Sequence, residues 1–419
     1  MDSTPAGKKK KKALWKHPWG YRESFLMGFF LLLAGFMVEI IGSGSVRMPA
    51  WPMNLFIIII IVAYFFLVHY FFRNPFVKWL SSVPAAIASI SFFTLMVMLM
   101  GFIQQGSAYA SDTWYGQLGL TRITSGWPYL FTAVYLLVVL GFTIVRRIRV
   151  FTLNNIAFLL NHAGLWVIVV AASLGSADMW RLSMQLNKRH PETTAYDGNR
   201  QAYDVGIGML LLDFSIEEYP PEIGLMRNED FTLRLEKGGR LAIVEEGGHD
   251  ALENFALHFT DYIGNARYYD GAYDSSDMDG GARAVYVYAT DMFSGDTLSG
   301  WVSDGSHEVP PSILKLNQEL SLAMVRMKPK KYSSSIRVFT SVEEYRDIYI
   351  EVNKPAAIDG WKIYQVGYDE RLGRWSQTST IEMVRDPWLP VVYTGIFMML
   401  LGSLYLLWMG KGRTKTKSS

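Results

Sequence analysis

The polar part of the chain closes with YIEVNKPAAIDGWKIYQVGYD (Tyr349–Asp369) and then continues through TSTIEMVRDPWLPVVYTGIFMMLLGSLYLLW (Thr378–Trp408). The first stretch reads as a β-strand region in which Tyr364-Gln365 is expected to be buried. The second passes through Arg385-Asp386-Pro387 straight into an apolar run that is long enough to cross a membrane. The join therefore predicts a water-facing β domain that is tied rigidly to a bilayer.

The composition indicates a chain built from apolar and polar blocks. Half of the 419 residues are hydrophobic, 19% are charged, and the formal net charge is +2. Cysteine is absent, so disulfides, thiolate metal sites and thiol redox chemistry are excluded. The first apolar block is not followed by a small-residue cleavage pattern, which argues against a cleavable signal peptide.

Six apolar blocks are long enough to span a hydrocarbon core, which takes about 20 helical residues. They are Phe25–Ile41, Asn54–Phe72, Pro84–Ile103, Pro128–Val145, Ile156–Ala177 and Leu389–Met409. The first block is short and contains Glu39, which we expect to reach the membrane interface because it lies near one end. The sequence thus predicts a polytopic α-helical membrane protein with six spans.

Basic residues indicate the orientation of these spans. If the spans alternate in direction, nearly all basic residues that flank them fall on one side of the membrane. These are Lys8 to Lys12, Lys16, Arg22, Arg73, Lys78, Arg146, Arg147, Arg149, Lys411, Arg413, Lys415 and Lys417. The short loops on the other side hold only Arg47 and Arg122. The positive-inside rule then places both termini on the cytoplasmic side.

The chain divides into a basic N-terminus (1–24), a five-span region (25–177), an exported β-rich domain (178–387), a last span (388–410) and a basic tail (411–419). Alternating runs and Gly-rich turns in the exported region predict an antiparallel β-sandwich or open barrel inserted between spans five and six. The expected strand runs are Met209–Tyr219, Phe231–Glu246, Arg283–Phe293, Ser334–Val342 and Asp347–Asn353. Partly helical spacing favours a short helix over Pro311–Met327.

Two histidines lie inside predicted spans, and a titratable side chain there is a functional candidate. His69 lies about 6 Å from the cytoplasmic end of its span and His162 about 9 Å into its own, at 1.5 Å per residue. Neutral imidazole is a good axial ligand for haem iron. Two plainer interpretations stay open: His69 could be an interfacial anchor, and His162 could hydrogen-bond a neighbouring helix.

Other chemical signatures are missing from the sequence. The exported histidines do not have metal-ligand spacing, and there is no GxSxG, P-loop or GxGxxG pattern. The basic tracts flank spans instead of interleaving with aromatics, which argues against nucleic-acid binding. Aromatic residues in the outer loop Ser111–Tyr129 are typical of an interfacial belt, and a docking surface is the rarer alternative.

Several segments, taken in order, resemble the ResB/CcsB family of System II cytochrome c biogenesis. They are Asn161-His162-Ala163-Gly164-Leu165, Asp213-Phe214, Tyr349–Asp369, and Arg385-Asp386-Pro387 with Tyr393-Thr394-Gly395 and Gly402. The chain departs from the family in having six predicted spans where four are common. It also lacks the tryptophan-rich haem-handling segment of CcsA, so it resembles the separate ResB/CcsB subunit.

This resemblance implies a role in haem attachment. Together with a CcsA-like membrane subunit, the chain would bring haem b across the membrane for attachment to CxxCH motifs of exported apocytochromes c. His162 would be the intramembrane ligand of the haem iron, with His69 as second choice. No residue stands out as acid, base or nucleophile, so the chain would be a subunit of a holocytochrome c synthase (haem lyase) and not a catalyst by itself.

Two other classes of function remain open. The chain could be a membrane scaffold whose exported domain binds a periplasmic protein, in which case no histidine is needed. It could also be a b-type haem electron carrier that uses His69 and His162. Two histidines on the same side of the membrane would support one haem at most.

Overall fold

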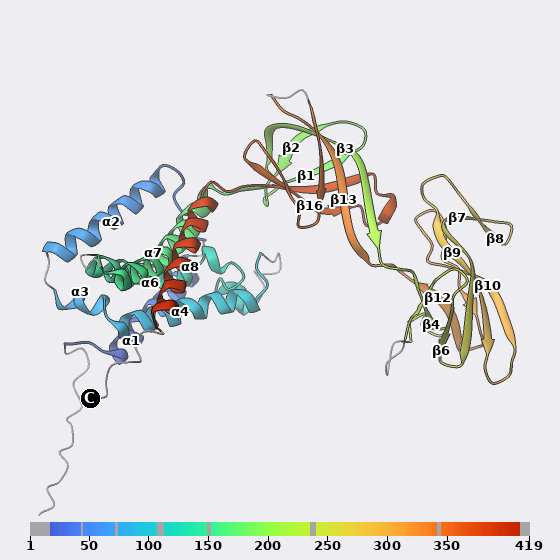
Figure 1. Cartoon of the computed structure of the whole chain (residues 1–419), viewed down its shortest axis with the longest axis horizontal. Coiled ribbons are helices and arrows are strands. Elements are labelled where there is room, and N and C mark those ends of the chain that lie inside the picture. The colour runs from blue at the N-terminus through green and yellow to red at the C-terminus, as the bar shows by residue number, and fades with distance from the viewer. Residues whose placement is uncertain are drawn as a thin grey trace, which may run out of the picture. The chain divides into compact units, whose positions relative to one another are not determined.

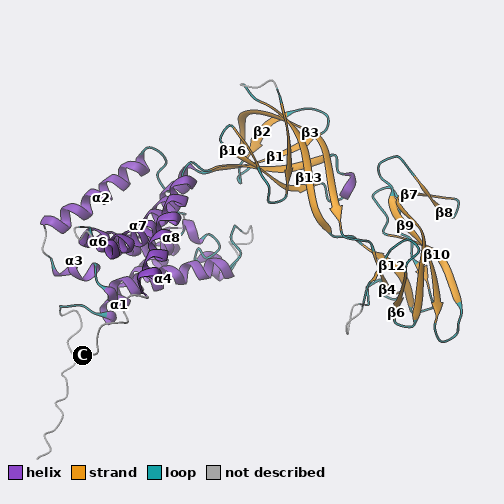
Figure 2. Cartoon of the chain, viewed as in Figure 1, coloured by secondary structure: helices purple, strands orange, loops and turns teal. Residues whose placement is uncertain are grey.

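The computed structural model describes residues 17–42, 45–71, 74–106, 113–148, 152–234, 240–341 and 345–410. The expected basic runs Lys8–Lys12 and 411–419 lie outside these residues, together with Lys16, Arg73 and Arg149. Residues 235–239 of the expected strand run Phe231–Glu246 also lie outside them. The chain forms two compact units, one of residues 1–179 and 386–419 and one of residues 180–385. We call them the helical unit and the β unit (Figures 1 and 2).

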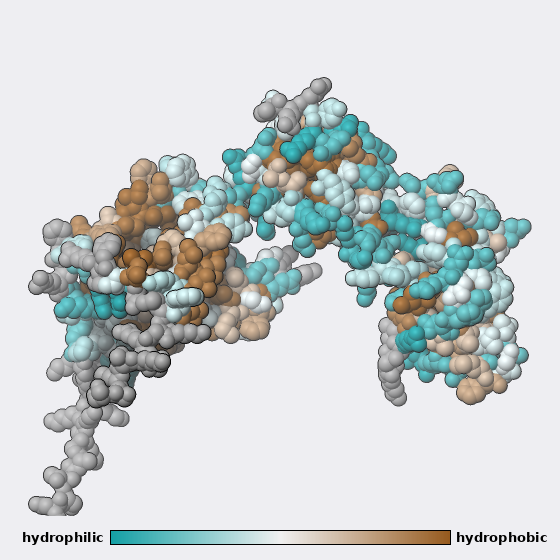
Figure 3. Space-filling model, in the orientation of Figure 1, coloured by the Kyte–Doolittle hydropathy of each residue, from teal (hydrophilic) through white to brown (hydrophobic). Residues whose placement is uncertain are grey.

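The helical unit contains six helices that are long and apolar enough to cross a membrane. These helices are α1 (Tyr21–Gly42), α2 (Met53–Phe71), α4 (Val83–Phe102), α6 (Trp127–Arg147), α7 (Leu153–Leu174) and α8 (Leu389–Gly410). Each lies within four residues of an expected span, which confirms the six apolar helices. Shorter elements are α3 (Pro75–Leu80), α5 (Trp114–Gln117), η2 (Ile123–Ser125) and η3 (Gly175–Asp178). Hydrophobic residues cover much of the visible face of this unit, whereas hydrophilic ones dominate that of the β unit (Figure 3).

Helix α6 is the central element of the helical unit, since it packs against α1, α2, α4 and α7. Small residues bring it close to its neighbours. A Cβ on Gly35 of α1 would come within 2.6 Å of the Pro128 backbone, and one on Gly141 would come within 2.2 Å of the Phe65 ring of α2. Close approach of this kind stabilises helix pairs in a membrane through van der Waals contact.

Glu39, near the end of α1, has a side chain that is fully buried within the helical unit. Its carboxylate accepts hydrogen bonds from the backbone N–H of Trp127 at 2.9 Å and from the Arg122 guanidinium at 3.0 Å. The first N–H groups of a helix lack internal partners and favour negative charge. Glu39 therefore caps the start of α6, and this ion pair neutralises a carboxylate at the end of α1.

The β unit is made of three antiparallel sheets. The eight-stranded sheet has the order β14-β13-β3-β2-β1-β17-β16-β15. Its strands are β1 (Trp180–Asn187), β2 (Glu192–Tyr196), β3 (Ala202–Glu218), β13 (Pro329–Phe339), β14 (Arg346–Glu351), β15 (Ala356–Ile358), β16 (Trp361–Tyr368) and β17 (Thr378–Arg385). β14 also contacts β16 across the sheet, so the sheet curls toward a barrel around one apolar core. We call this part the barrel lobe.

The other two sheets form a sandwich lobe with a shared apolar core. One has the order β10-β9-β7-β6 with β8 on β7, and the other has the order β11-β12-β4-β5. Their strands are β4 (Glu222–Arg227), β5 (Ala242–Ile243), β6 (His249–Leu252), β7 (Phe255–Tyr269), β8 (Ala272–Ser275), β9 (Ala282–Asp291), β10 (Thr297–Ser303), β11 (Leu314–Lys315) and β12 (Leu320–Val325). The expected β-rich region is thus confirmed.

Two local expectations in the β unit are wrong. Residues 311–327 hold β11 and β12 instead of a helix. The Asn317 side chain accepts the N–H groups of Glu319 and Leu320 at 2.9 and 2.8 Å, which turns the chain between the two strands. Spacing alone could not separate a buried strand from a short helix here. In Phe231–Glu246, the described residues form only β5 and an isolated bridge at Leu233.

The buried polar group expected at Tyr364-Gln365 is present at Gln365, which is 4% exposed. Its side-chain oxygen accepts the hydroxyl of Ser379 at 3.0 Å, and Ser379 accepts the hydroxyl of Ser334 at 2.8 Å. The three residues lie on β16, β17 and β13. Because each buried donor has an acceptor, the barrel core tolerates this polar chain.

Candidate functional site

Helices α7 and α8 form a tightly packed pair that carries His162. Gly164 of α7 and Gly395 and Gly402 of α8 lie at the contact, where an added Cβ would come within 2.6 to 2.8 Å of backbone atoms of the facing helix. The Asn161 amide donates to the Ser403 hydroxyl in the same contact. Asn161 therefore makes a polar contact between the two helices. Because His162 is the next residue, this contact also sets the direction in which His162 projects from α7.

His162 lies on a different side of α7 from Asn161, and its imidazole stacks on Phe158 with ring centroids 3.7 Å apart. Its Nδ1 atom lies 2.9 Å from the Phe158 carbonyl oxygen. A carbonyl oxygen can only accept, so this bond requires the proton to be on Nδ1. The Nε2 atom then carries a lone pair, and in the part of the chain that the structure describes it has no hydrogen-bond partner.

A cation also lies over the Phe158 ring. The Arg147 guanidinium at the end of α6 sits over the Phe158 ring, 4.5 Å from its centroid. One turn beyond His162, Trp166 donates to the Leu137 carbonyl of α6 at 3.2 Å. Phe158, His162 and Trp166 therefore follow one stripe of α7, with a positive charge near the end where α6 finishes and α7 begins.

This arrangement suits an imidazole that ligates a metal. Histidine ligands commonly donate their other ring N–H to a carbonyl or carboxylate, which fixes the tautomer and orients the ring. The half-buried His162, with Nδ1 held by a backbone carbonyl, meets that condition. Its apolar helix would suit the faces of a porphyrin, and a nearby guanidinium would suit its carboxylates.

His69 is placed less favourably. It lies on α2, is half-buried, and makes an edge contact with the ring of Tyr70 at 5.4 Å. Among the described residues no contact joins its ring to that of His162. The structure therefore does not bring the two intramembrane candidates together.

The structure brings together one pair of histidines that the sequence did not single out. His249 on β6 and His258 on β7 are directly opposite in an antiparallel pair, and their rings stack with centroids 4.2 Å apart. No short sequence motif predicts this pair, because the two rings meet only through the register of β6 against β7. Within the described ranges there is no group of three or more side chains that could hold a metal ion.

A second polar centre that sequence reasoning missed lies where α7 ends and α8 begins. The Asp178 carboxylate accepts the Trp51 N–H at 2.7 Å, the Asn54 amide at 2.7 Å and the Trp388 indole N–H at 2.6 Å. Asn54 is fully buried and also donates to the Leu174 carbonyl. Asp178 thus ties the start of α2 and of α8 to the end of α7, next to the two chain segments that join the helical unit to the β unit.

The aromatic residues of the segment 113–129 divide into packed and exposed ones. Tyr115 and Tyr129 pack on a buried cluster that contains Leu120 and Ile123, whereas Trp114 is 71% exposed. The described part of this segment therefore packs mainly against the end of the bundle between α4 and α6.

The six apolar helices are compatible with a multi-pass membrane protein, and the β unit lies between the last two of them in the sequence. The model of the ResB-like family matches residues 151–378, which is more than half of the chain. The chain belongs to this family, which is linked to cytochrome c biogenesis. The matched region begins just before α7 and contains His162. A comparison with curated proteins gives no match.

Proposed function

We propose that this chain is the ResB/CcsB subunit of a System II cytochrome c synthase, and that His162 is an axial ligand of its substrate haem through Nε2. A CcsA-like membrane subunit would complete the coordination of the iron and the synthase. Exported apocytochromes c would receive the haem at their CxxCH motifs.

The hydrogen bond from Nδ1 of His162 to the Phe158 carbonyl is the observation that carries this proposal. It leaves the lone pair of Nε2 available to iron and holds the ring in one orientation. The Phe158 ring would shield one side of the site, and Arg147 would pair with a haem carboxylate near the helix ends. Backbone support of this kind would not be needed in a side chain that merely anchors a helix.

The proposed orientation places both termini in the bacterial cytoplasm and the β unit on the outer side of the inner membrane. Arg22, Lys78, Arg146 and Arg147 would then face the cytoplasm, in keeping with the positive-inside rule. The haem-ligand site would lie in the cytoplasmic half of the bilayer. We expect haem to enter there and to leave toward the partner subunit.

The test is an absorption spectrum of the complex, purified in detergent after co-expression with its CcsA-like partner. Wild type should show sharp reduced α and β bands, and His162→Ala should lose or weaken them. His190→Ala is the matched control, because this histidine lies exposed on the β unit beside Glu192 and should leave the bands unchanged. His69→Ala tests the second candidate in the same way.

Unchanged bands in His162→Ala would refute the ligand assignment. If the variant also supported normal cytochrome c maturation, the chain would be a scaffold whose helices serve as an anchor. Exogenous imidazole offers a further check, since it should restore bands in His162→Ala if the variant is folded and lacks nothing but its ligand.

A further inference from the structure

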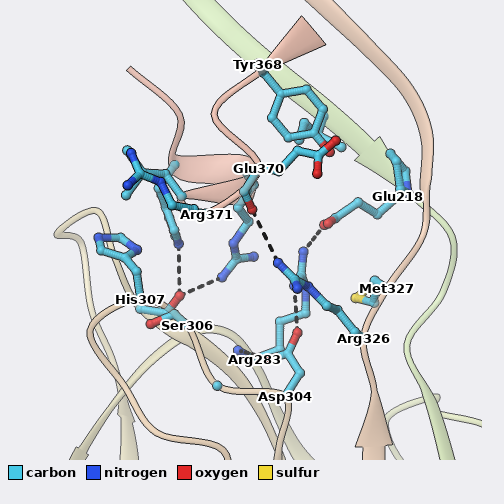
Figure 4. Close-up of a pocket in the computed structure, with 18 residues that line it drawn as sticks. Glu218, Arg283, Asp304, Ser306, His307, Arg326, Met327, Tyr368, Glu370 and Arg371 are labelled. Atoms are coloured by element: carbon cyan, nitrogen blue, oxygen red, sulfur yellow. Dashed lines mark hydrogen bonds and ion pairs between the residues drawn. The ribbon is translucent and has the colours of Figure 1, made fainter. Parts of the chain in front are cut away.

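The β unit contains a cavity of about 570 Å³ where the barrel lobe and the sandwich lobe meet (Figure 4). Its walls come from the end of β3, the start of β9 and of β13, the loop after β10, and the segment between β16 and β17 that contains η4 (Gly373–Trp375). Four arginines and three acidic residues line it. A cavity of this volume is in the range that holds small-molecule ligands.

Arg283 forms ion pairs with two of the three acidic residues of the cavity, Asp304 and Glu218. Arg283 is 8% exposed and donates from Nη1 to Asp304 at 2.9 Å, while its backbone N–H bonds the same carboxylate at 3.1 Å. It also forms an ion pair with Glu218 from the end of β3, as Figure 4 shows. These two carboxylates are therefore committed to Arg283, as a buried charge requires.

Arg374 is not paired directly with a carboxylate in the part of the chain that the structure describes. Its guanidinium donates to the carbonyl oxygens of Gly264 at 2.6 Å and Gly281 at 3.2 Å, and it lies over the Trp375 ring at 4.6 Å. Burial, reinforced by the nearby positive charge of Arg283, lowers the pKa of Arg374 to about 10. The cavity thus holds a partly desolvated cation whose hydrogen bonds go to neutral groups.

Arg326, which also lines the cavity, repeats this pattern. It lies between β12 and β13, and its guanidinium donates to the backbone carbonyl of Glu370 at 3.3 Å. Across the described ranges, neither Arg326 nor Arg374 forms an ion pair with a carboxylate. Arg371, the fourth arginine, is paired with Asp369 at the rim.

We propose that this cavity binds a small organic anion that carries two or more carboxylates, held between Arg326 and Arg374. Guanidinium groups bind carboxylates through two parallel N–H···O bonds, and the association is stronger where water is partly excluded. Tyr368, Trp375, Leu372 and Met327 also line the cavity and supply apolar surface for the body of such a ligand. The site is separate from His162, and the proposal does not depend on haem binding.

Isothermal titration of the full chain in detergent, at constant ionic strength, tests this site. Benzene-1,3,5-tricarboxylate is the probe, because its carboxylates can reach two guanidinium groups while its ring meets the apolar wall. Inorganic phosphate is the comparison. Arg326→Gln and Arg374→Gln each remove one of the two cations. Arg181→Gln is the matched control, because Arg181 lies on β1, outside the cavity, and pairs with Glu382.

Wild type should bind the tricarboxylate at a single saturable site in each chain. Each cavity variant should weaken binding by about tenfold or more, the usual loss for a hydrogen bond to a charged group, and the control should bind as wild type does. If Arg374→Gln fails to fold, the test rests on Arg326→Gln. The Arg326 guanidinium makes a single hydrogen bond of 3.3 Å, so its replacement should disturb the fold little. No saturable binding by wild type, or unchanged binding by the folded variants, would overturn the proposal. Equal affinity for phosphate would overturn its assignment to an organic anion.

Discussion

The contact between α7 and α8 leads to a prediction about stability. A single added methyl group at Gly402 should lower the free energy of unfolding. A Cβ on Gly402 would come within 2.6 Å of the Ala157 carbonyl oxygen and 2.7 Å of the Asn161 nitrogen. Both are backbone atoms, so Gly402→Ala must push the two helices apart. Overpacking of this kind costs about 1–3 kcal/mol. Loss of the Asn161–Ser403 bond adds about 0.6 kcal/mol, and the better helix propensity of alanine returns about 0.8 kcal/mol.

Gly402→Ala should therefore lower the free energy of unfolding by about 1–3 kcal/mol. Gly101→Ala is the matched control: it adds the same methyl group near the end of α4, where nothing lies within 4 Å. That variant should be neutral or more stable by up to about 1 kcal/mol. The measurement is SDS-induced unfolding of the detergent-purified chain, followed by far-UV circular dichroism. Equal stability of the two variants would refute the close packing of α7 on α8.

The remaining predictions concern the β unit. Ser379→Ala should reduce protection from hydrogen exchange in β16 and β17 about 30-fold or more, because it strands the Ser334 hydroxyl and the Gln365 oxygen. Ser334→Ala leaves no buried donor unpaired and should cost less; the reverse order would contradict this hydrogen-bond chain. The Arg337 guanidinium lowers the pKa of Asp347 below its ordinary value. The ion pair therefore stabilises the fold fully at pH values above the ordinary pKa of an aspartate. This stabilisation is lost as the pH falls through the lowered pKa. The difference in the midpoint of thermal unfolding between wild type and Asp347→Asn should accordingly become smaller at acid pH. A difference that stays constant with pH would count against the ion pair.

The polar contacts of the helical unit include the ends of the two chain segments that lead to and from the β unit. Asp178 lies two residues before β1, and Trp388 lies three residues after β17. Their hydrogen bond joins the two chain segments that enter and leave the β unit, at 2.6 Å. Within the helical unit, the ends of these two segments are therefore held side by side.

The sequence by itself determined the apolar helices, because twenty consecutive apolar residues leave the backbone few alternatives in a membrane. It also determined the presence of a β-rich region and the candidate role of His162, since an imidazole within an apolar span is unusual enough to be noticed without any contact. The family resemblance rested on order and spacing and was likewise available from sequence.

Contacts between distant segments were decided by the tertiary structure alone. The burial of Glu39 against Trp127, the stacking of His249 on His258 and the grouping of Arg326 with Arg374 join residues whose separation along the chain carries no periodic signal. Strand register and helix packing set these distances, and both depend on which surfaces of the whole chain are buried together. For the same reason, the sequence could propose His162 as a ligand, but only the fold assigns its proton to Nδ1 and leaves Nε2 free.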